Sequence, residues 1–410
     1  MFYADTIIIG GGASGLMSAI SASNSGCKVI LLEKNNRIGK KILVTGNGRC
    51  NYTNILLTKN DYNHPFYVEK VFEGFGTQNT IDLFESFGIV PKVENDGKTF
   101  PLSEQASSFL DVFLYELSLR KNIEVFLNKE VIKIQKNKDG FYVRTFDNNI
   151  YSAKTVILCA GGKSMPLTGS DGSGYSLVEN LGHSISAIFP ALVKLKVDSP
   201  YLKQLSGVKI NSQIDLMVND RIYQSEYGDI LFTNYGISGP TVLELSRKAN
   251  EFLNKNVSPI LRVIIIQEIS KSKIIERMEN FADREVSQAL IGLVNKRLIS
   301  VLIKEAGIAK TNTLVRDIEP KNLYKLIDLM YDWRFKVIGS LGFDDSQVTA
   351  GGVKVNEINN ETLESLIIPG LFFAGEVMDI DGRCGGYNLQ WAWSSGYIAG
   401  RSAASRCQGN

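Results

Sequence analysis

Residues 7–15 read Ile-Ile-Ile-Gly-Gly-Gly-Ala-Ser-Gly, and this stretch decides the fold of the segments around it. The apolar run 6–9 predicts a short strand that ends at a glycine turn. Residues 14–24, rich in Ala and Ser, predict a helix, and residues 28–33 predict a second strand. A strand, a glycine turn, a helix and a strand in this order predict a βαβ unit with buried parallel strands.

Three glycines, Gly10, Gly12 and Gly15, have the Gly-x-Gly-x-x-Gly spacing of a dinucleotide-binding turn. The first makes the turn, the second lets backbone approach a pyrophosphate, and the third lets helix and strand pack closely. The helix N-terminus offers free N–H groups and a partial positive charge to phosphates. Glu33 ends the second strand, where a carboxylate binds ribose hydroxyls and disfavours a 2′-phosphate. The sequence therefore predicts a dinucleotide with an unphosphorylated adenosine ribose.

Later segments favour a flavin dinucleotide over a nicotinamide one. Residues 34–54 are dense in Gly, Lys, Arg and Asn, which would let backbone and donors surround a flat ring. The apolar runs 156–162 and 372–376 each end in a glycine, placing backbone beside the cofactor again. Residues 381–388, DGRCGGYN, then lead into a helix whose N-terminus would stabilise negative charge at the pyrimidine edge of a reduced flavin. We therefore expect FAD.

The bulk composition is that of a soluble globular protein. The chain has 410 residues, enough for two or three domains. Its formal net charge of +2, from 45 basic and 43 acidic residues, gives no overall field that would attract nucleic acid or an anionic membrane. No signal sequence precedes the first strand, and no apolar run is long enough to span a bilayer. We expect a cytoplasmic protein with a small-molecule substrate, without a nucleic-acid or membrane partner; the sequence leaves the oligomeric state open.

Cysteine and histidine usage argues against a metal centre. The five cysteines form no CxxC pair, and only His64 and His183 are available as imidazole ligands. Reduced thiols and no metal site are expected. Neither histidine is placed for covalent attachment of a flavin, so non-covalent FAD is favoured.

Changes of pattern along the chain predict a discontinuous first domain. Residues 66–88 and 103–120 predict amphipathic helices, and 123–160 predicts five short strands in an antiparallel meander. Residues 345–410 return to strands and glycine-rich turns, with a strand at 371–374 and a helix from near Asn388. We expect residues 1–190 and 345–410 to form the FAD-binding domain.

The segment between these parts has a different character. Residues 191–344 are expected to form an insert with a β-rich subdomain over 191–265 and a helical subdomain over 266–336. The predicted fold class is therefore α/β: a three-layer, discontinuous FAD/NAD(P)-binding Rossmann-like domain interrupted by β-rich and helical subdomains.

The longest motifs resemble a family of bacterial flavoproteins that includes aminoacetone oxidase-like and 3-dehydro-bile-acid Δ4,6-reductase-like members. The resemblance covers essentially the whole chain. It is most specific in GKKILVTGNGRCNYTN (39–54) and in residues 370–400, with shorter marks such as TGSDGSGY (168–175). More distantly, the layout is similar to the fumarate reductase and aspartate oxidase flavoproteins. The resemblance implies a discontinuous FAD domain, a β-rich subdomain and a small helical insert.

The resemblance also implies roles for individual residues. Glu33 would bind the adenosine ribose, and the loop 41–51 would lie beside the isoalloxazine. Gly375 and Glu376 would lie near the ribityl-phosphate, and residues 387–389 at the pyrimidine edge. The residues expected to bind the cofactor are Gly10, Gly12, Ala13, Ser14, Gly15, Glu33, Lys34, Lys41, Gly48, Arg49, Cys50, Asn51, Val131, Ala160, Gly161, Gly375, Glu376, Gly386, Tyr387, Asn388 and Leu389.

Arg49 and Lys41 are the candidate catalytic residues, and two interpretations of each stay open. Each side chain either braces the loop or contacts a phosphate, or it touches the flavin and orients an anionic or carbonyl substrate.

The expected function is an FAD-dependent oxidoreductase that transfers hydride between a small organic substrate and the flavin. A C=C reductase or dehydrogenase with NAD(P)H as a transient electron donor is favoured, although the chain has a single Gly-x-Gly-x-x-Gly with strand and helix context. The alternatives are an oxygen-using oxidase of a small amine or aminoketone, a non-catalytic FAD-binding redox sensor, and a tRNA-modifying flavoprotein. The near-neutral charge counts against the last.

Overall fold

The computed structural model describes residues 2–409 and divides into two compact units. Among the described residues, the first contains 2–190 and 347–409, and the second contains 191–346. Within the described residues, no helix combines the length and apolar character that a membrane crossing requires.

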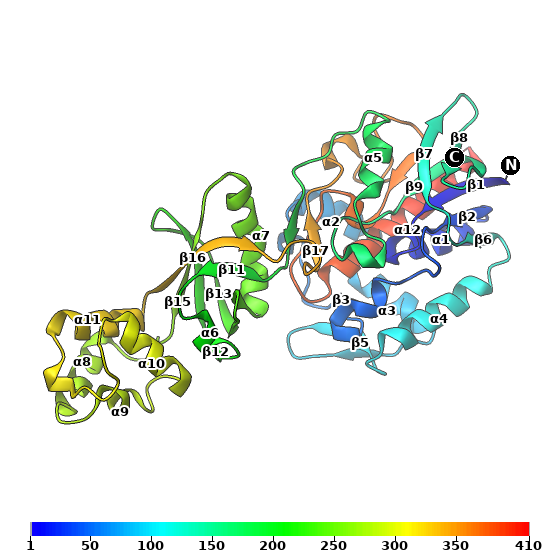
Figure 1. Cartoon of the computed structure of the whole chain (residues 1–410). Coiled ribbons are helices and arrows are strands. Elements are labelled where there is room, and N and C mark those ends of the chain that lie inside the picture. Colours follow the sequence, from blue (N-terminus) through cyan, green and yellow to red (C-terminus); the bar gives the residue numbers. More distant parts are fainter. Residues whose placement is uncertain (1, 410) are drawn as a thin grey trace. The chain divides into compact units, whose positions relative to one another are not determined.

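A seven-stranded mixed sheet forms the centre of the first unit, as Figure 1 shows. Five strands are parallel: β6 (Ile123–Phe126), β2 (Val29–Leu32), β1 (Phe2–Ile9), β9 (Ile150–Leu158) and β18 (Leu371–Phe373). Strands β7 (Val131–Lys136) and β8 (Phe141–Thr145) extend the sheet antiparallel beyond β9. Both β2 and β18 are fully buried, which matches their uninterrupted apolar sequences.

Two helices that are far apart in sequence pack closely beside this sheet. They are α1 (Ala13–Asn24) and α12 (Tyr387–Gln408). Glycines of α12 permit the approach: a Cβ on Gly396 or Gly400 would lie 2.5 Å from the backbone oxygen of Ser14 or Ser18. Ser18 Oγ also lies 3.0 Å from Gly396 O. The glycines therefore fix the distance between the helix that follows the glycine turn and the helix that ends the chain.

Shorter elements surround the sheet of the first unit. A small antiparallel sheet and a two-stranded ribbon contain β3 (Thr53–Asn54), β5 (Lys98–Pro101), β4 (Pro91–Val93), β10 (Phe189–Ala191) and β17 (Val348–Ala350). The remaining α-helices of this unit are α2 (Pro65–Gly74), α3 (Thr77–Ser86), α4 (Ala106–Ser118) and α5 (Ser173–Glu179). Phe84 of α3 lies at the centre of a buried aromatic cluster with Phe109, Phe113 and Trp393.

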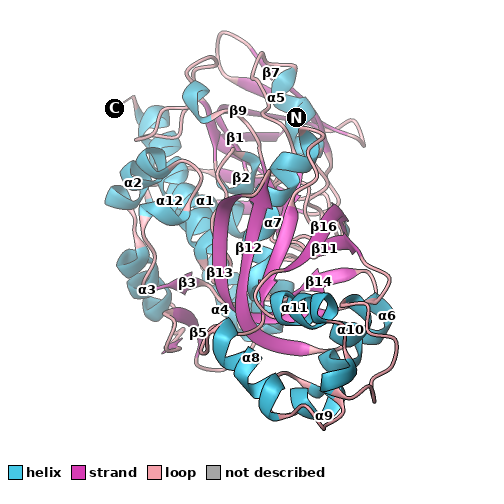
Figure 2. Ribbon diagram, turned by 90° about the vertical axis from the view of Figure 1, so that its left-hand side faces the viewer, coloured by secondary structure: helices cyan, strands magenta, loops and turns pink. Residues whose placement is uncertain are grey.

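The second unit is built around a closed six-stranded barrel, seen in magenta in Figure 2. The barrel order is β11 (Leu195–Asp198), β14 (Gly236–Ser238), β13 (Arg221–Phe232), β12 (Lys209–Val218), β15 (Ile260–Ile264) and β16 (Trp333–Ser340). Its helices are α6 (Leu202–Leu205), α7 (Pro240–Asn254), α8 (Lys271–Asn280), α9 (Val286–Leu290), α10 (Lys296–Glu305) and α11 (Pro320–Leu329). One hydrophobic core joins the barrel interior to these helices.

The expected α/β Rossmann-like class is confirmed, and two local expectations were wrong. The predicted helix 66–88 is two helices, α2 and α3, because Gly74 and Gly76 flank the break. The two strands expected across 149–160 are the single strand β9, which changes partner from β8 to β18 along its length. The 15-residue helix α7 lies inside the region read as β-rich.

Candidate functional site

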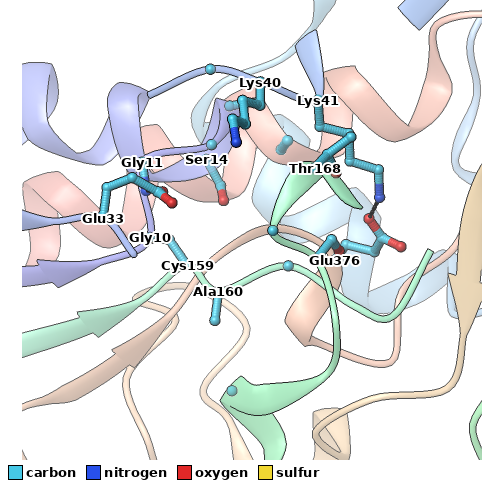
Figure 3. A pocket seen from close by; sticks show the side chains of 18 of the residues that line it. Gly10, Gly11, Ser14, Glu33, Lys40, Lys41, Cys159, Ala160, Thr168 and Glu376 are labelled. Atoms are coloured by element: carbon cyan, nitrogen blue, oxygen red, sulfur yellow. Dashed lines mark hydrogen bonds and ion pairs between the residues drawn. The ribbon is translucent and has the colours of Figure 1, made fainter. Parts of the chain in front are cut away.

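An elongated cavity opens at the carboxyl ends of β1, β2 and β9, the edge where parallel sheets bind nucleotides. Its volume is about 1250 Å³, counted with the space open to solvent. All of its lining residues belong to the first unit. Figure 3 shows the glycine turn and Glu33 in one part of the cavity and the Lys41–Glu376 pair in another.

The glycine turn forms the floor of the cavity at the start of α1. Gly10 has a positive φ of 103°, and a Cβ there would lie 2.4 Å from Cys159 O. A Cβ on Gly12, by contrast, would meet no atom within 4 Å. The open space above Gly12 and the free N–H groups of the first turn of α1, with Ala13 and Ser14, form a cradle suited to a pyrophosphate.

Glu33 is held in the cavity wall by backbone donors. Its Oε2 accepts a hydrogen bond from Gly11 N (2.7 Å), and its Oε1 accepts one from Asn35 N (2.8 Å). The side chain is buried, and the carboxylate has further lone pairs that can accept from a diol. The fixed position of Glu33 beside the glycine turn therefore suits an adenosine ribose.

A partly buried ion pair marks another part of the cavity. Lys41 Nζ lies 2.6 Å from Glu376 Oε2, and Glu376 Oε1 accepts from Thr349 N at 2.8 Å. Asn388 and Leu389 in the first turn of α12 line the same cavity, so the positive end of a 22-residue helix faces this space. The arrangement places a cation held by Glu376 and a fixed helix dipole where negative charge can be stabilised.

Most of the residues predicted to bind the cofactor line the cavity. They are Gly10, Gly12, Ala13, Ser14, Glu33, Lys34, Lys41, Val131, Ala160, Gly161, Glu376, Asn388 and Leu389. The predicted residues outside its lining are Gly15, Gly48, Arg49, Cys50, Asn51, Gly375, Gly386 and Tyr387. Whether each contacts bound FAD stays a prediction.

Several residues outside the lining have visible structural roles. A Cβ on Gly15 would lie 1.9 Å from Gly10 O, so this glycine permits the close packing of helix on turn. Gly375 donates its N–H to Ser395 Oγ (2.9 Å) and accepts from Trp391 Nε1 (3.1 Å). Burial raises the pKa of the Cys50 thiol to about 12, which leaves it protonated and unreactive at neutral pH.

The Arg49 side chain is occupied by two carboxylates. Its Nη1 lies 2.9 Å from Glu94 Oε1 and 3.1 Å from Glu104 Oε1, and the guanidinium stacks over Phe100 at 4.1 Å from the ring centroid. These contacts fit the interpretation that Arg49 braces the loop 39–54. Lys41, which lines the cavity, fits the alternative interpretation of a residue near the reacting groups.

Sequence reasoning did not single out one wall of the cavity. This wall includes Arg37, Lys40, Lys129, Thr168, Gly169, Ser170 and Ser173. Four residues of this wall, 168–170 and 173, belong to the motif TGSDGSGY (168–175). This motif contributes to the family resemblance, but it did not by itself predict a contact with the cofactor. Ser170 Oγ is buried and has no hydrogen-bond partner among the described residues. An unsatisfied buried hydroxyl in a cavity wall is a group that a ligand would satisfy.

These features fit FAD. An open cradle at Gly12, an acid at the end of β2 and an unpartnered hydroxyl at Ser170 lie along one elongated cavity. The cavity continues to a cation and a helix N-terminus suited to the ring end of the cofactor. Within the described residues, no cluster of three or more His, Cys, Asp or Glu side chains could hold a metal ion.

The chain is similar to known proteins over almost its whole length. The model of the HI0933-like protein Rossmann domain matches residues 4–402. The chain is 36% identical to the 3-dehydro-bile acid delta(4,6)-reductase of Clostridium scindens, over 97% of this chain and 98% of that protein. It is 31% identical to the ribosomal RNA dihydrouridine synthase of Escherichia coli, over 96% of each chain.

A solved structure shows the same fold at low identity. The 3-ketosteroid delta1-dehydrogenase of Sterolibacterium denitrificans, in complex with 1,4-androstadiene-3,17-dione, aligns with a TM-score of 0.53. The alignment covers 99% of this chain and 100% of that chain at 12% identity. The expectation of an FAD-dependent oxidoreductase is confirmed as a class. With its glycine turn, buried acid and continuous match over almost the whole length, this chain belongs to the HI0933-like Rossmann family.

Proposed function

We propose that this chain reduces C=C bonds conjugated to a carbonyl group, with FAD as the cofactor and NAD(P)H as the electron donor. The observation that carries the proposal is that the Lys41 ammonium group and the first turn of α12 line one end of the FAD-shaped cavity. Hydride addition to a conjugated C=C bond places negative charge on the carbonyl oxygen. A cation and a helix N-terminus at that point stabilise such charge.

The residues of this chain orient the reacting groups, and bound FAD supplies the hydride when it is reduced. Lys41 Nζ carries three N–H donors, and one of them points to Glu376. The remaining donors can hold a carbonyl oxygen of substrate or cofactor. Because Thr349 N fixes the other oxygen of Glu376, the carboxylate keeps the ammonium group in a set position. The cavity that contains Lys41 also has an apolar lining, formed by Leu389, Ile380 and Val348, which limits the access of water to the ammonium group.

The reductase relative supports the reaction class. Its name places the double bonds at positions 4 and 6 of a 3-dehydro bile acid, where they are conjugated to the 3-oxo group. The reaction adds a hydride to the carbon of the double bond that is farther from the carbonyl group. A proton then adds to the carbon of the same bond that is nearer to the carbonyl group. In this chain we assign the stabilisation of the intervening negative charge to Lys41.

A second candidate is reduction of a uridine base in RNA, and the synthase relative is the observation that favours it. The C5=C6 bond of uracil is also conjugated to a carbonyl, so the two candidates share one type of chemistry. The formal net charge of +2 argues against it, because RNA-binding surfaces are usually strongly basic. A small-molecule substrate is therefore the first candidate.

The deciding experiment is an anaerobic single turnover. FAD-loaded protein, reduced by dithionite, is mixed in a stopped-flow cell with a 3-oxo-4,6-diene steroid, and the return of oxidised flavin absorbance is followed. We expect fast reoxidation and a product heavier by two hydrogens. A flavin that stays reduced with the steroid would contradict the small-molecule proposal.

Parallel arms separate the other functions. Reoxidation by a ribosomal RNA fragment, but not by the steroid, would support the RNA candidate. Reoxidation in air faster than with any C=C acceptor would support the oxidase alternative, and no reoxidation by any acceptor would support a redox sensor. Anaerobic titration of the oxidised protein with NADH and with NADPH identifies the donor as the nucleotide that bleaches the flavin.

A further inference from the structure

Two cysteines that are 380 residues apart meet at the amino ends of the main-sheet strands, away from the cofactor cavity. Cys27 is buried and directly precedes Lys28 and β2, and Cys407 is half-buried in the last turn of α12. The Cys27 thiol contacts the carbonyl oxygen of Ala404 at 3.9 Å. Ala404 lies one helical turn before Cys407, so both lie on the face of α12 that Cys27 approaches. The pKa of each thiol is shifted chiefly by the other thiol, so the two side chains lie close enough to interact.

The surroundings of Cys407 are polar. Its Sγ lies 3.4 Å from Thr155 Oγ1, 3.8 Å from Thr6 Oγ1 and 3.3 Å from Asp5 O. The Lys154 ammonium group donates to the backbone oxygen of Cys407 at 3.2 Å and lies 3.7 Å from Asp5 Oδ1. Two hydroxyl groups and a nearby cation therefore surround a partly accessible sulfur, whereas Cys27 lies behind it without solvent access.

These contacts make the two thiols chemically unequal. The pKa of the Cys407 thiol is lowered, chiefly by the neighbouring Cys27 thiol and further by the hydroxyl groups of Thr155 and Thr6. The pKa of Cys27 is raised, chiefly by the same contact and by burial. A thiolate-rich cysteine that solvent can reach, next to a protonated and buried one, is the arrangement of an oxidisable thiol with its resolving partner.

We propose that Cys407 and Cys27 form a reversible disulfide in which Cys407 is the peroxide-reactive thiol and Cys27 the resolving thiol. In the first step the Cys407 thiolate attacks one oxygen of a hydroperoxide, the O–O bond breaks, and a sulfenic acid forms as the other oxygen leaves as hydroxide or alkoxide. In the second step Cys27 sulfur attacks the Cys407 sulfur and expels the sulfenic hydroxyl as water. Two thiols are oxidised and one hydroperoxide is reduced, with hydrogen peroxide giving two waters.

The bond would tie the last turn of α12 to the connection between α1 and β2. The opposite end of α12 contributes Asn388 and Leu389 to the cofactor cavity, about 28 Å from Cys407 along the helix axis. A cross-link that closes a loop of almost the whole chain restricts the unfolded state strongly and prevents local opening of the C-terminal turn. The site is independent of the substrate proposed above, because none of its residues lines the cavity.

The test uses the full FAD-loaded protein, treated with dithiothreitol or with hydrogen peroxide and then denatured, alkylated and digested for mass spectrometry. We expect peroxide to produce a peptide pair joined through Cys27 and Cys407, which dithiothreitol removes, and a rise in Tm. In Cys27→Ser, dimedone should label Cys407 as a sulfenic acid; in Cys407→Ser, Cys27 should stay unlabelled. Cys384→Ser removes the other half-exposed cysteine and should leave the cross-link unchanged.

Two results would overturn the proposal. The first is recovery of both cysteines as alkylated free thiols at a peroxide concentration that already oxidises Cys384. The second is a cross-link between different chains, which would show that the cysteines do not pair within one molecule. A kinetic measurement distinguishes a reactive thiol from a structural one. Alkylation of Cys407 in the Cys384→Ser protein should reach half its maximal rate at a pH well below that of a free thiol, and Thr155→Val should move this midpoint upward.

Discussion

Lys41 and Glu376, which are 335 residues apart in sequence, form an ion pair with 2.6 Å between Nζ and Oε2. The pair joins the loop 39–54 to the segment after β18 and lies in the cavity lined by the glycine turn. Both side chains are mostly buried, so the interaction is less screened by solvent than a surface pair. In this contact the two most specific sequence motifs act on each other directly through charge.

Replacing Lys41 should slow the chemical step more than it weakens FAD binding. In Lys41→Met, we expect the rate of flavin reoxidation by a conjugated C=C substrate to fall on the order of 10²–10³-fold, as for loss of one donor to a developing oxyanion. Lys40→Met is the matched control, because Lys40 Nζ donates to Asn35 Oδ1 and makes no ion pair with Glu376. Equal losses in the two variants would contradict the assignment.

Two glycines of the same motif should respond oppositely to alanine. In Gly12→Ala the new Cβ would meet no protein atom within 4 Å, so Tm should be kept while the Kd for FAD rises by about tenfold or more, or about 1.4 kcal/mol. In Gly15→Ala the Cβ would lie 1.9 Å from Gly10 O, and the free energy of unfolding should fall by about 1–3 kcal/mol. Fluorescence titration with FAD and thermal melts of the apoprotein measure both. Unchanged FAD affinity in Gly12→Ala would contradict the assignment of the pyrophosphate to this turn.

Arg49 should contribute to loop stability rather than to chemistry. Its guanidinium is held by Glu94, Glu104 and Phe100, so Arg49→Met should lower Tm by a few degrees and leave the single-turnover rate per bound flavin nearly unchanged. Phe100→Leu removes the stacking partner and also truncates a buried ring, so it should lower Tm more than Arg49→Met does. A large loss of rate in Arg49→Met with normal Tm would support the alternative in which Arg49 contacts the substrate.

The stability of the protein should depend on pH through His183. Its side chain is buried between Glu357 (3.1 Å) and Ser365 (2.8 Å), and burial lowers its pKa below the usual 6.5. The unfolded chain therefore binds a proton that the folded chain does not, so this contribution is complete above pH 6.5 and is lost as pH falls through the folded pKa. The slope for one group is at most about 1.4 kcal/mol per pH unit.

Urea unfolding between pH 7.5 and 5 tests this dependence. His183→Gln should lower stability at pH 7.5 but reduce the additional loss on acidification. His64→Gln is the control, because the His64 side chain is more exposed than that of His183. Its contact with the Asp379 carboxylate, at 3.7 Å, is also longer than the contact of His183 with Glu357. The same slope in the wild type and in His183→Gln would assign the acid sensitivity to other groups.

Local sequence signals predicted the nucleotide-binding part of the fold well. Gly10, Gly12 and Glu33 fall within a single βαβ unit, where spacing alone fixes which residues meet at the end of the sheet. The return of the chain at β18 and α12 could be predicted for the same reason, since a short apolar strand leads into glycines and a helix. The fold class followed from these segments.

Features that depend on distant pairing could not be predicted in this way. Closure of β11–β16 into a barrel depends on the register between residues up to 145 positions apart, for example Leu195 with Ser340. The partners of Arg49 come from residues 45 and 55 positions later, so its sequence context suggested a cofactor contact as readily as a brace. Helix α7 was not predicted, although Val242, Leu245 and Ala249 have helical spacing.

The central claim is that the cavity beside the glycine turn holds FAD, and the absorbance spectrum of the purified protein after reconstitution with FAD tests it most directly. The account predicts flavin bands that stay with the protein through gel filtration, release of intact FAD on denaturation, and retention of a smaller share of the bands by Gly12→Ala. A wild-type protein that elutes without flavin absorbance after reconstitution, while remaining folded by thermal melting, would contradict it.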